Sequence, residues 1–152
     1  MADLYFDSSA LVKSYVAELG TNWVSTILDG GQNRIFISSL AEVEVTAALT
    51  RRFRVGDLTV QQLDQACDEV RQDAEAYISV SLTNDLIRAA VGLARTHGLR
   101  GYDAVQLATA LEVRNALIEN ELGQDFTLVS ADLELNAAAL LEGLQVEDPN
   151  TH

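Results

Sequence analysis

Short, uninterrupted apolar stretches alternate with longer helical patterns along this chain, and this alternation is what most constrains its fold. Residues 3–6, 34–38 ("RIFIS") and 126–130 ("FTLVS") are continuous apolar stretches of strand length. Such stretches are typical of strands buried on both faces of a parallel sheet. The stretch 77–82 ("YISVSL") alternates and predicts a less buried strand, and 144–148 ("LQVED") predicts an edge strand.

Helical patterns occupy the intervals between these strands. Strands that alternate with helices or helix pairs indicate an α/β domain, and the right-handed crossover rule places helices on both faces of its sheet. We therefore expect one domain over residues 1–152, a three-layer α/β/α arrangement around a central, mainly parallel sheet of four to five strands. The predicted helices span 9–18, 21–29, 40–54, 60–75, 85–97, 103–120 and 133–142.

Several of these helices carry start and stop signals. Thr59 with Gln62, and Ser39 with Glu42, match the capping box, in which a hydroxyl and a side chain three residues later satisfy the free amides of the first turn. Gly98 falls just after a predicted helix, where the left-handed conformation favours glycine. The capping box accounts for Glu42 without a functional role.

Three aspartates lie at the junction between a predicted strand and the following helix or at the start of a buried helix. Asp7 ends the first strand, Asp132 follows "FTLVS", and Asp103 opens the helix 103–120, which is apolar on nearly every side. In open α/β sheets, ligands bind outside the carboxyl ends of the strands. Each aspartate taken alone is better explained as a helix N-cap than as a catalytic acid. Against that explanation, Ser8 or Ser9 would suffice to cap the first helix.

A fourth acid is expected from the segment "ISSLAEVEVTAALTRR" (37–52). Glu44 lies on the same side of the predicted helix as small apolar residues, and the apolar residues indicate that this side is buried. An uncompensated buried charge is costly, so this glutamate requires a partner. The alternative to a functional role is a buried pair with Arg51, seven residues later on the same stripe. We favour Glu44 as a functional acid.

A group of carboxylates cannot all stay ionised unless something positive joins them. Hard oxygen ligands without histidine or cysteine favour Mg²⁺ or Mn²⁺. Such an ion lowers the pKa of bound water and neutralises charge on a phosphoryl oxygen, so the pattern points to phosphodiester hydrolysis. It also answers part of the objection raised by a net charge of −13, because an acidic cleft holding a cation attracts phosphate.

The positive residues are few and unevenly placed. Nine of the ten are arginines, and Arg51, Arg52 and Arg54 crowd into "TRRFR", where a bidentate phosphate clamp is expected. Lys13, the one lysine, is read as a solvated helix residue. A single cysteine, no secretory signal and no stretch of about 20 apolar residues predict a cytoplasmic protein without a membrane segment.

At this point the chain resembles the PIN-domain ribonucleases, particularly the VapC toxins of bacterial toxin–antitoxin pairs. "YFDSSALVK" is similar to the family's opening strand and first acid, and "ISSLAEVEVTAALTRR" resembles its second block. "LRGYDAVQLATAL" matches the third block closely, and "TLVSADLELNAAA" resembles the fourth. The likeness covers nearly the whole chain, with four blocks in order at the family's spacing. One departure is "DLELN", because basic residues often follow this aspartate in the family.

The resemblance implies Asp7, Glu44, Asp103 and Asp132 around one or two Mg²⁺ or Mn²⁺ ions. It also implies that Ser9 orients the first carboxylate or a bound water. The implied reaction is endonucleolytic cleavage of single-stranded RNA regions, in which an activated water attacks the phosphodiester. The implied partners are a small antitoxin with a basic segment, which suits an acidic toxin, and a second copy of the chain in a homodimer.

Two other functions fit parts of the sequence. The first is a non-catalytic interaction domain whose acidic cleft binds a basic peptide or protein, and it predicts tight binding without metal. The second is a small phosphate-signalling domain of the doubly wound type with Asp7 as a metal ligand, although no lysine lies near a late strand to support it.

Overall fold

The structure, a computed structural model, describes residues 1–122 and 125–152. Its strands lie where the apolar stretches predict them: β1 (Asp3–Phe6), β2 (Arg34–Ser38), β3 (Ile78–Val80), β4 (Phe126–Val129) and β5 (Gln145–Glu147). The α-helices are α1 (Ser8–Leu11), α2 (Thr21–Asp29), α3 (Ala41–Arg54), α4 (Val60–Ala76), α5 (Asn84–His97), α6 (Gly101–Glu119) and α7 (Leu133–Leu141). Two short 3₁₀ helices, η1 (Val12–Ser14) and η2 (Pro149–Thr151), complete the described elements.

All five strands belong to one parallel sheet in the order β3-β2-β1-β4-β5. β1 is therefore central, with β2 on one side and β4 on the other. The chain fills one half of the sheet, then returns past β1 to build the other half. This reversal opens a crevice at the carboxyl ends of β1 and β4, the place where open α/β sheets bind ligands.

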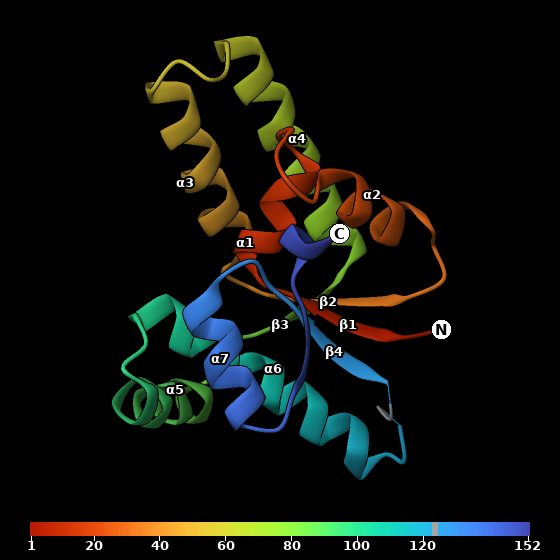
Figure 1. The fold of residues 1–152 in the computed structure, drawn as a ribbon, viewed down its shortest axis with the longest axis vertical. Helices are drawn as coiled ribbons and strands as arrows, with labels where there is room; N and C mark the ends of the chain where they lie inside the picture. The colour runs from red at the N-terminus through yellow and green to blue at the C-terminus, as the bar shows by residue number, and fades with distance from the viewer. Residues whose placement is uncertain (123–124) are drawn as a thin grey trace.

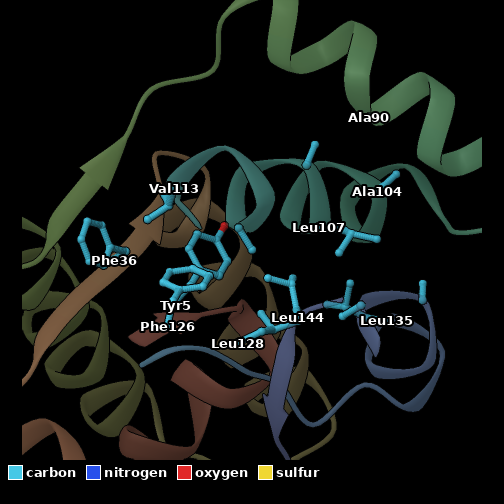
Figure 2. Packing of buried hydrophobic residues seen from close by; sticks show 14 of the residues in the cluster. Tyr5, Phe36, Ala90, Ala104, Leu107, Val113, Phe126, Leu128, Leu135 and Leu144 are labelled. Atoms are coloured by element: carbon cyan, nitrogen blue, oxygen red, sulfur yellow. The ribbon is translucent and has the colours of Figure 1, made fainter. Parts of the chain in front are cut away.

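Helices cover both faces of the sheet and complete the predicted three-layer architecture. Figure 1 shows α1 to α4 on one side of the strands and α5, α6 and α7 on the other. Consecutive residues of β1 point to opposite faces, so Tyr5 packs into the cluster under α5–α7 while Leu4 and Phe6 pack into the cluster under α1–α4. Figure 2 shows Tyr5, Phe126 and Leu128 from the strands facing Leu107 of α6.

The first helical segment is shorter than predicted. The sequence pattern predicts a helix over 9–18, but α1 ends at Leu11 and η1 ends at Ser14. The reason is a set of side-chain bonds that hold the following residues as a loop. Lys13 Nζ donates to the carbonyl of Leu19 at 2.8 Å, and Thr21 Oγ1 donates to the carbonyl of Val16 at 3.1 Å.

Two predicted helix starts also require correction. The capping box at Thr59 and Gln62 is present, but the one predicted at Ser39 and Glu42 is wrong, because α3 begins at Ala41 without a side-chain cap. Likewise α6 begins at Gly101 rather than at Asp103, which therefore lies within the first turn. Among the described residues, no helix combines the length and the apolarity that crossing a bilayer requires.

Candidate active site

Asp7 is the residue at which β1 ends and α1 begins. Its Oδ1 accepts hydrogen bonds from the amide of Ala10 at 3.1 Å and from the hydroxyl of Ser9 at 2.7 Å. Asp7 is therefore the N-cap of α1, although Ser8 or Ser9 was available for that role. The side chain is buried at 3% exposure. Its two internal bonds fall on one oxygen, so the second oxygen has no protein partner among the described residues.

Asp132 occupies the matching position after β4. It is the N-cap of α7, and its Oδ1 accepts from the amide of Leu135 at 2.9 Å. The loops that carry Asp7 and Asp132 are joined by Ser9, whose Oγ accepts from the amide of Ala131 at 2.9 Å while donating to Asp7. One hydroxyl thus fixes the first acid and tethers it to the loop of the fourth.

Glu44 is held by a glutamine on the other face of the sheet. Gln106 lies fully buried in α6, three residues after Asp103, and its Nε2 donates to Glu44 Oε1 at 2.7 Å. The same amide is itself fixed, because its Oε1 accepts from the hydroxyl of Tyr5 at 2.5 Å. The described residues contain no ion pair between Glu44 and Arg51, so the alternative of a buried pair is not observed.

These carboxylates line one pocket. Its volume is about 320 Å³ and it lies at the carboxyl edge of the sheet, between α1, α3 and the start of α6. Asp103 is half-buried there, and its carboxylate accepts no hydrogen bond from the described residues. The structure therefore brings all of the predicted acids and Ser9 to one place: Asp7, Ser9, Glu44, Asp103 and Asp132.

Burial and mutual repulsion disfavour the state in which all of the carboxyl groups in this pocket are ionised. Burial, together with the charges of Asp103 and Asp132, raises the pKa of Asp7 to about 7. Burial and the charge of Asp103 raise the pKa of Glu44, against the opposing effect of the Gln106 bond. Burial and the charge of Asp132 raise the pKa of Asp103. A pocket of this kind favours whatever brings positive charge into it.

The donor set fits a hard divalent cation. The candidate ligands are all carboxylates. Asp7, Glu44 and Asp132 each accept hydrogen bonds through only one of their two oxygens. One oxygen of each acid is thus available, which suits Mg²⁺ or Mn²⁺. In residues 1–122 and 125–152, no three potential ligands are already close enough to form a ready-made cluster. Closing such a cluster around an ion therefore requires side chains to move.

The three arginines of the predicted phosphate clamp separate in the structure. Arg51 lines the carboxylate pocket. Arg52 instead pairs with Glu18 at 2.9 Å and with Asp57 at 2.8 Å, and it lines a different pocket. Arg54, in the last turn of α3, is exposed and lines neither of these pockets.

Lys13 is not the solvated residue that the sequence pattern predicts. It is 5% exposed, and its ammonium group forms an ion pair with Glu18 at 2.9 Å. Its partners therefore hold it within the fold, away from the carboxylate pocket.

Sequence reasoning missed the residues that position the acids. Gln106 carried one visible signal, since a glutamine one turn after Asp103 in an otherwise apolar helix must find a buried partner. Ser130, also buried, accepts from the amide of Asp132 at 3.1 Å, and its carbonyl accepts from Asn136 Nδ2 at 2.8 Å. No pattern in the sequence marks Ser130, because its role depends on where β4 ends.

Comparisons with known proteins agree with this geometry. Residues 4–141 match the family model of the PIN domain. Two relatives from Mycobacterium tuberculosis are 42% identical over 110 residues, which cover 72% of this chain and 76% of theirs. They are Ribonuclease VapC45 of strain CDC 1551 / Oshkosh and Ribonuclease VapC49 of strain ATCC 25618 / H37Rv.

Solved structures show the same fold at lower identity. PAE2754 from Pyrobaculum aerophilum superposes with a TM-score of 0.63 at 20% identity, covering 99% of this chain and 91% of its own. VapBC-1 from nontypeable Haemophilus influenzae superposes with a TM-score of 0.61 at 12% identity, covering 97% of this chain and 98% of its own. These likenesses support the three-layer architecture.

Proposed function

This chain belongs to the PIN-domain family, in its VapC-like group, and on that basis we propose that it is a metal-dependent endoribonuclease that acts as the toxin of a toxin–antitoxin pair. The observation that carries the proposal is the gathering of Asp7, Glu44, Asp103 and Asp132 around one pocket at the carboxyl edge of the sheet. Its two relatives with 42% identity bear the name ribonuclease.

The four carboxylates would hold Mg²⁺ or Mn²⁺. When bound, such an ion would activate water and offset the charge that builds on a phosphoryl oxygen. Three of the acids have a support: Asp7 is fixed by Ser9, Asp132 by the first turn of α7, and Glu44 by Gln106. Supports of this kind orient the ligands of a metal site. The carboxylate of Asp103 accepts no hydrogen bond from the described residues.

The substrate of this proposal is single-stranded RNA. A phosphate that enters the pocket meets Arg51 on its wall, and a guanidinium is suited to bind phosphate oxygens in pairs. Arg52 is engaged with Glu18 and Asp57, so we assign the phosphate contact to Arg51. The net charge of −13 otherwise repels nucleic acid at long range, and the bound cation and Arg51 offset it locally.

The proposal includes two protein partners. A small antitoxin with a basic segment suits the acidic surface by charge, and the solved neighbour VapBC-1 is consistent with a partner chain. A homodimer is supported by apolar side chains that α7 leaves exposed, namely Leu133, Leu140 and Leu141 at 75%, 60% and 80%. Leu133 and Leu140 are two turns apart and share one side of this helix, and exposed apolar side chains mark a contact surface where they form one patch. Light scattering of the wild type and of Leu140→Glu tests the dimer, because a charge in that surface should give monomers.

Cleavage of a fluorescently labelled single-stranded RNA tests the activity. The wild type with Mn²⁺ should cut it, and excess chelator should stop the reaction. Asp103→Asn should lower the rate by about 100-fold or more, because loss of a ligand should cost at least as much as loss of a residue that supports one, which costs about 10- to 100-fold. Asp85→Asn, an exposed aspartate in the first turn of α5, is the matched control and should cut normally. Undiminished cleavage in chelator or in Asp103→Asn would contradict the proposal.

A further inference from the structure

An apolar groove adjoins the carboxylate pocket and shares part of its wall. The groove has a volume of about 840 Å³ and lies between α5 and the beginnings of α3 and α6. Its apolar lining includes Leu40, Ile87 and Val91. Five residues line both the groove and the pocket: Glu44, Arg51, Tyr102, Asp103 and Asp132. The two cavities are therefore continuous across Tyr102 and Asp103.

Tyr102 stands at this boundary with its ring available. It precedes Asp103 in the first turn of α6 and is 59% exposed. Its hydroxyl forms no hydrogen bond with any described residue, so neither core packing nor an internal bond accounts for an aromatic ring at this position. An exposed ring beside a phosphate site is how single-stranded nucleic acids are commonly held, because every base offers a flat face for stacking.

The charged residues that line the groove fall into two parts. At the rim that it shares with the pocket lie Arg51 and the acids Glu44, Asp103 and Asp132, whereas among its other lining residues Arg100 alone is charged. An apolar wall beside a guanidinium group matches a nucleotide, whose base is flat and whose flanking phosphates are negative. A basic peptide that passed the acidic rim would meet like charge at Arg100.

Resting on the proposed ribonuclease function, we propose that Tyr102 and this groove bind the nucleobase next to the scissile phosphate, with the ring of Tyr102 stacked on that base. The phosphate lies in the carboxylate pocket, and the neighbouring base is directed across Tyr102 into the groove. Recognition is by stacking and apolar contact rather than by the polar edges of the base.

Kinetics on one mapped RNA test the stacking. The probe is a labelled single-stranded RNA whose main cleavage position is known, together with versions that are abasic on either side of that position. Tyr102→Leu should raise KM by about 5- to 150-fold, the range given by one base stacked on an aromatic ring, with a smaller change in kcat. Tyr102→Phe keeps the ring and should behave like the wild type. Phe53→Leu removes a half-exposed ring that lines neither cavity and should also leave KM unchanged.

The abasic substrates identify what the ring touches. On one of the two abasic RNAs, the KM of the wild type should rise by about the factor that Tyr102→Leu causes on intact RNA. On that same abasic RNA, the wild type and Tyr102→Leu should have equal KM values. Equal KM values for wild type and Tyr102→Leu on intact RNA would overturn the inference. A Tyr102→Leu defect that persists in full on both abasic RNAs would overturn it as well, and would assign the groove to something other than a base.

A binding measurement separates this inference from the proposed activity. The Asp7→Asn variant binds a single-stranded RNA that carries the fluorescent base 2-aminopurine next to the mapped cleavage position. If the wild type cleaves no RNA, 2-aminopurine is placed at each position in turn. In either design the fluorescence should fall on binding. Adding Tyr102→Leu should remove that quenching, whereas Tyr102→Phe should retain it. Absence of cleavage by the wild type would defeat the proposed function, and the quenching result alone would then decide the inference. Quenching that is absent, or unchanged by Tyr102→Leu, would overturn the inference even if the wild type cleaves RNA.

Discussion

Gln106 and Glu44 lie on elements that cover opposite faces of the sheet, yet the amide of one donates a 2.7 Å hydrogen bond to the carboxylate of the other. The bond passes at the carboxyl edge of the strands, where the two helical layers meet. It fixes one oxygen of the α3 acid, and the other oxygen accepts no hydrogen bond from the described residues. Gln106 is therefore a positioning residue for the candidate site.

Replacing Gln106 by leucine should weaken the site without unfolding the protein. Leucine is similar in volume, but it leaves Glu44 without its donor and Tyr5 without its acceptor. We expect Mn²⁺ affinity, measured by calorimetric titration, to fall by about 10- to 100-fold, as for other residues that support metal ligands. Thr50→Val is the control, because it removes a part-buried hydroxyl from the helix that carries Glu44, and this hydroxyl donates to the carbonyl of Thr46 within that helix. Equal affinity in Gln106→Leu and wild type would refute the positioning role.

Ser9→Ala should destabilise the protein as well as the site. The substitution removes the donor to Asp7 and leaves the amide of Ala131 without its acceptor. An unsatisfied buried group costs about 1–3 kcal/mol, so urea denaturation should show a loss of that size in the free energy of unfolding. Ser14→Ala, whose hydroxyl bonds only within its own turn, should lose much less. Indistinguishable losses would show that Ser9 does not join the two loops.

Asp7→Asn should stabilise the metal-free protein above neutral pH. Burial and neighbouring acids raise the pKa of Asp7 from 3.8 to about 7, so the folded protein holds this proton more tightly than the unfolded chain does. Its contribution to stability is complete below pH 3.8 and is lost as pH rises through 7, at about 1.4 kcal/mol per pKa unit. Asparagine also caps helices well and carries no charge.

Thermal unfolding in chelator at pH 5 and pH 8 measures this effect. The Tm of the wild type should fall between the two values by more than that of Asp7→Asn, and the variant should be the more stable protein at pH 8. Asp85→Asn, which alters an exposed acid, should follow the wild type. A variant less stable than the wild type at pH 8 would show that burial and the neighbouring charges do not disfavour the ionised form of Asp7.

Arg51 and Arg52 should respond to alanine substitution in opposite ways. Arg51 lines the carboxylate pocket, so Arg51→Ala should raise KM for RNA several-fold with little change in Tm. Arg52 joins Glu18 to Asp57, so Arg52→Ala should cost up to about 1 kcal/mol of stability, as for other part-exposed pairs, and leave KM unchanged. The two adjacent variants thus serve as controls for each other, and a KM defect confined to Arg52→Ala would reverse the assignment.

The sequence was sufficient for the strands and for the convergence of the acids. Each buried strand is a continuous apolar stretch, and parallel strands place their carboxyl ends at one edge of the sheet. If β1 and β4 are neighbours, Asp7 and Asp132 must therefore lie close together at that edge. Helical periodicity separated Glu44 from Glu42, and the structure leaves Glu42 exposed while Glu44 lines the pocket.

What the sequence could not supply depends on contacts between distant segments. The early end of the first helix follows from the hydrogen bond that Lys13 donates to the carbonyl of Leu19. Hydrophobic periodicity does not predict a bond of this kind. Arg51 and Arg52 have different surroundings because Arg52 forms an ion pair with Glu18, which lies in the loop between η1 and α2. A helix cap and a functional role do not exclude each other at Asp7 and Asp132. Each residue caps a helix with one oxygen, and its other oxygen accepts no hydrogen bond from the described residues.

Anomalous diffraction from crystals grown with Mn²⁺ would reveal whether these carboxylates together hold a divalent cation. We expect an anomalous peak in the pocket, contacted by oxygens of Asp7 and Asp103, that disappears in crystals of Asp103→Asn. A clear map at millimolar Mn²⁺ with no peak among Asp7, Glu44, Asp103 and Asp132 would contradict this expectation, whatever the protein was found to bind elsewhere.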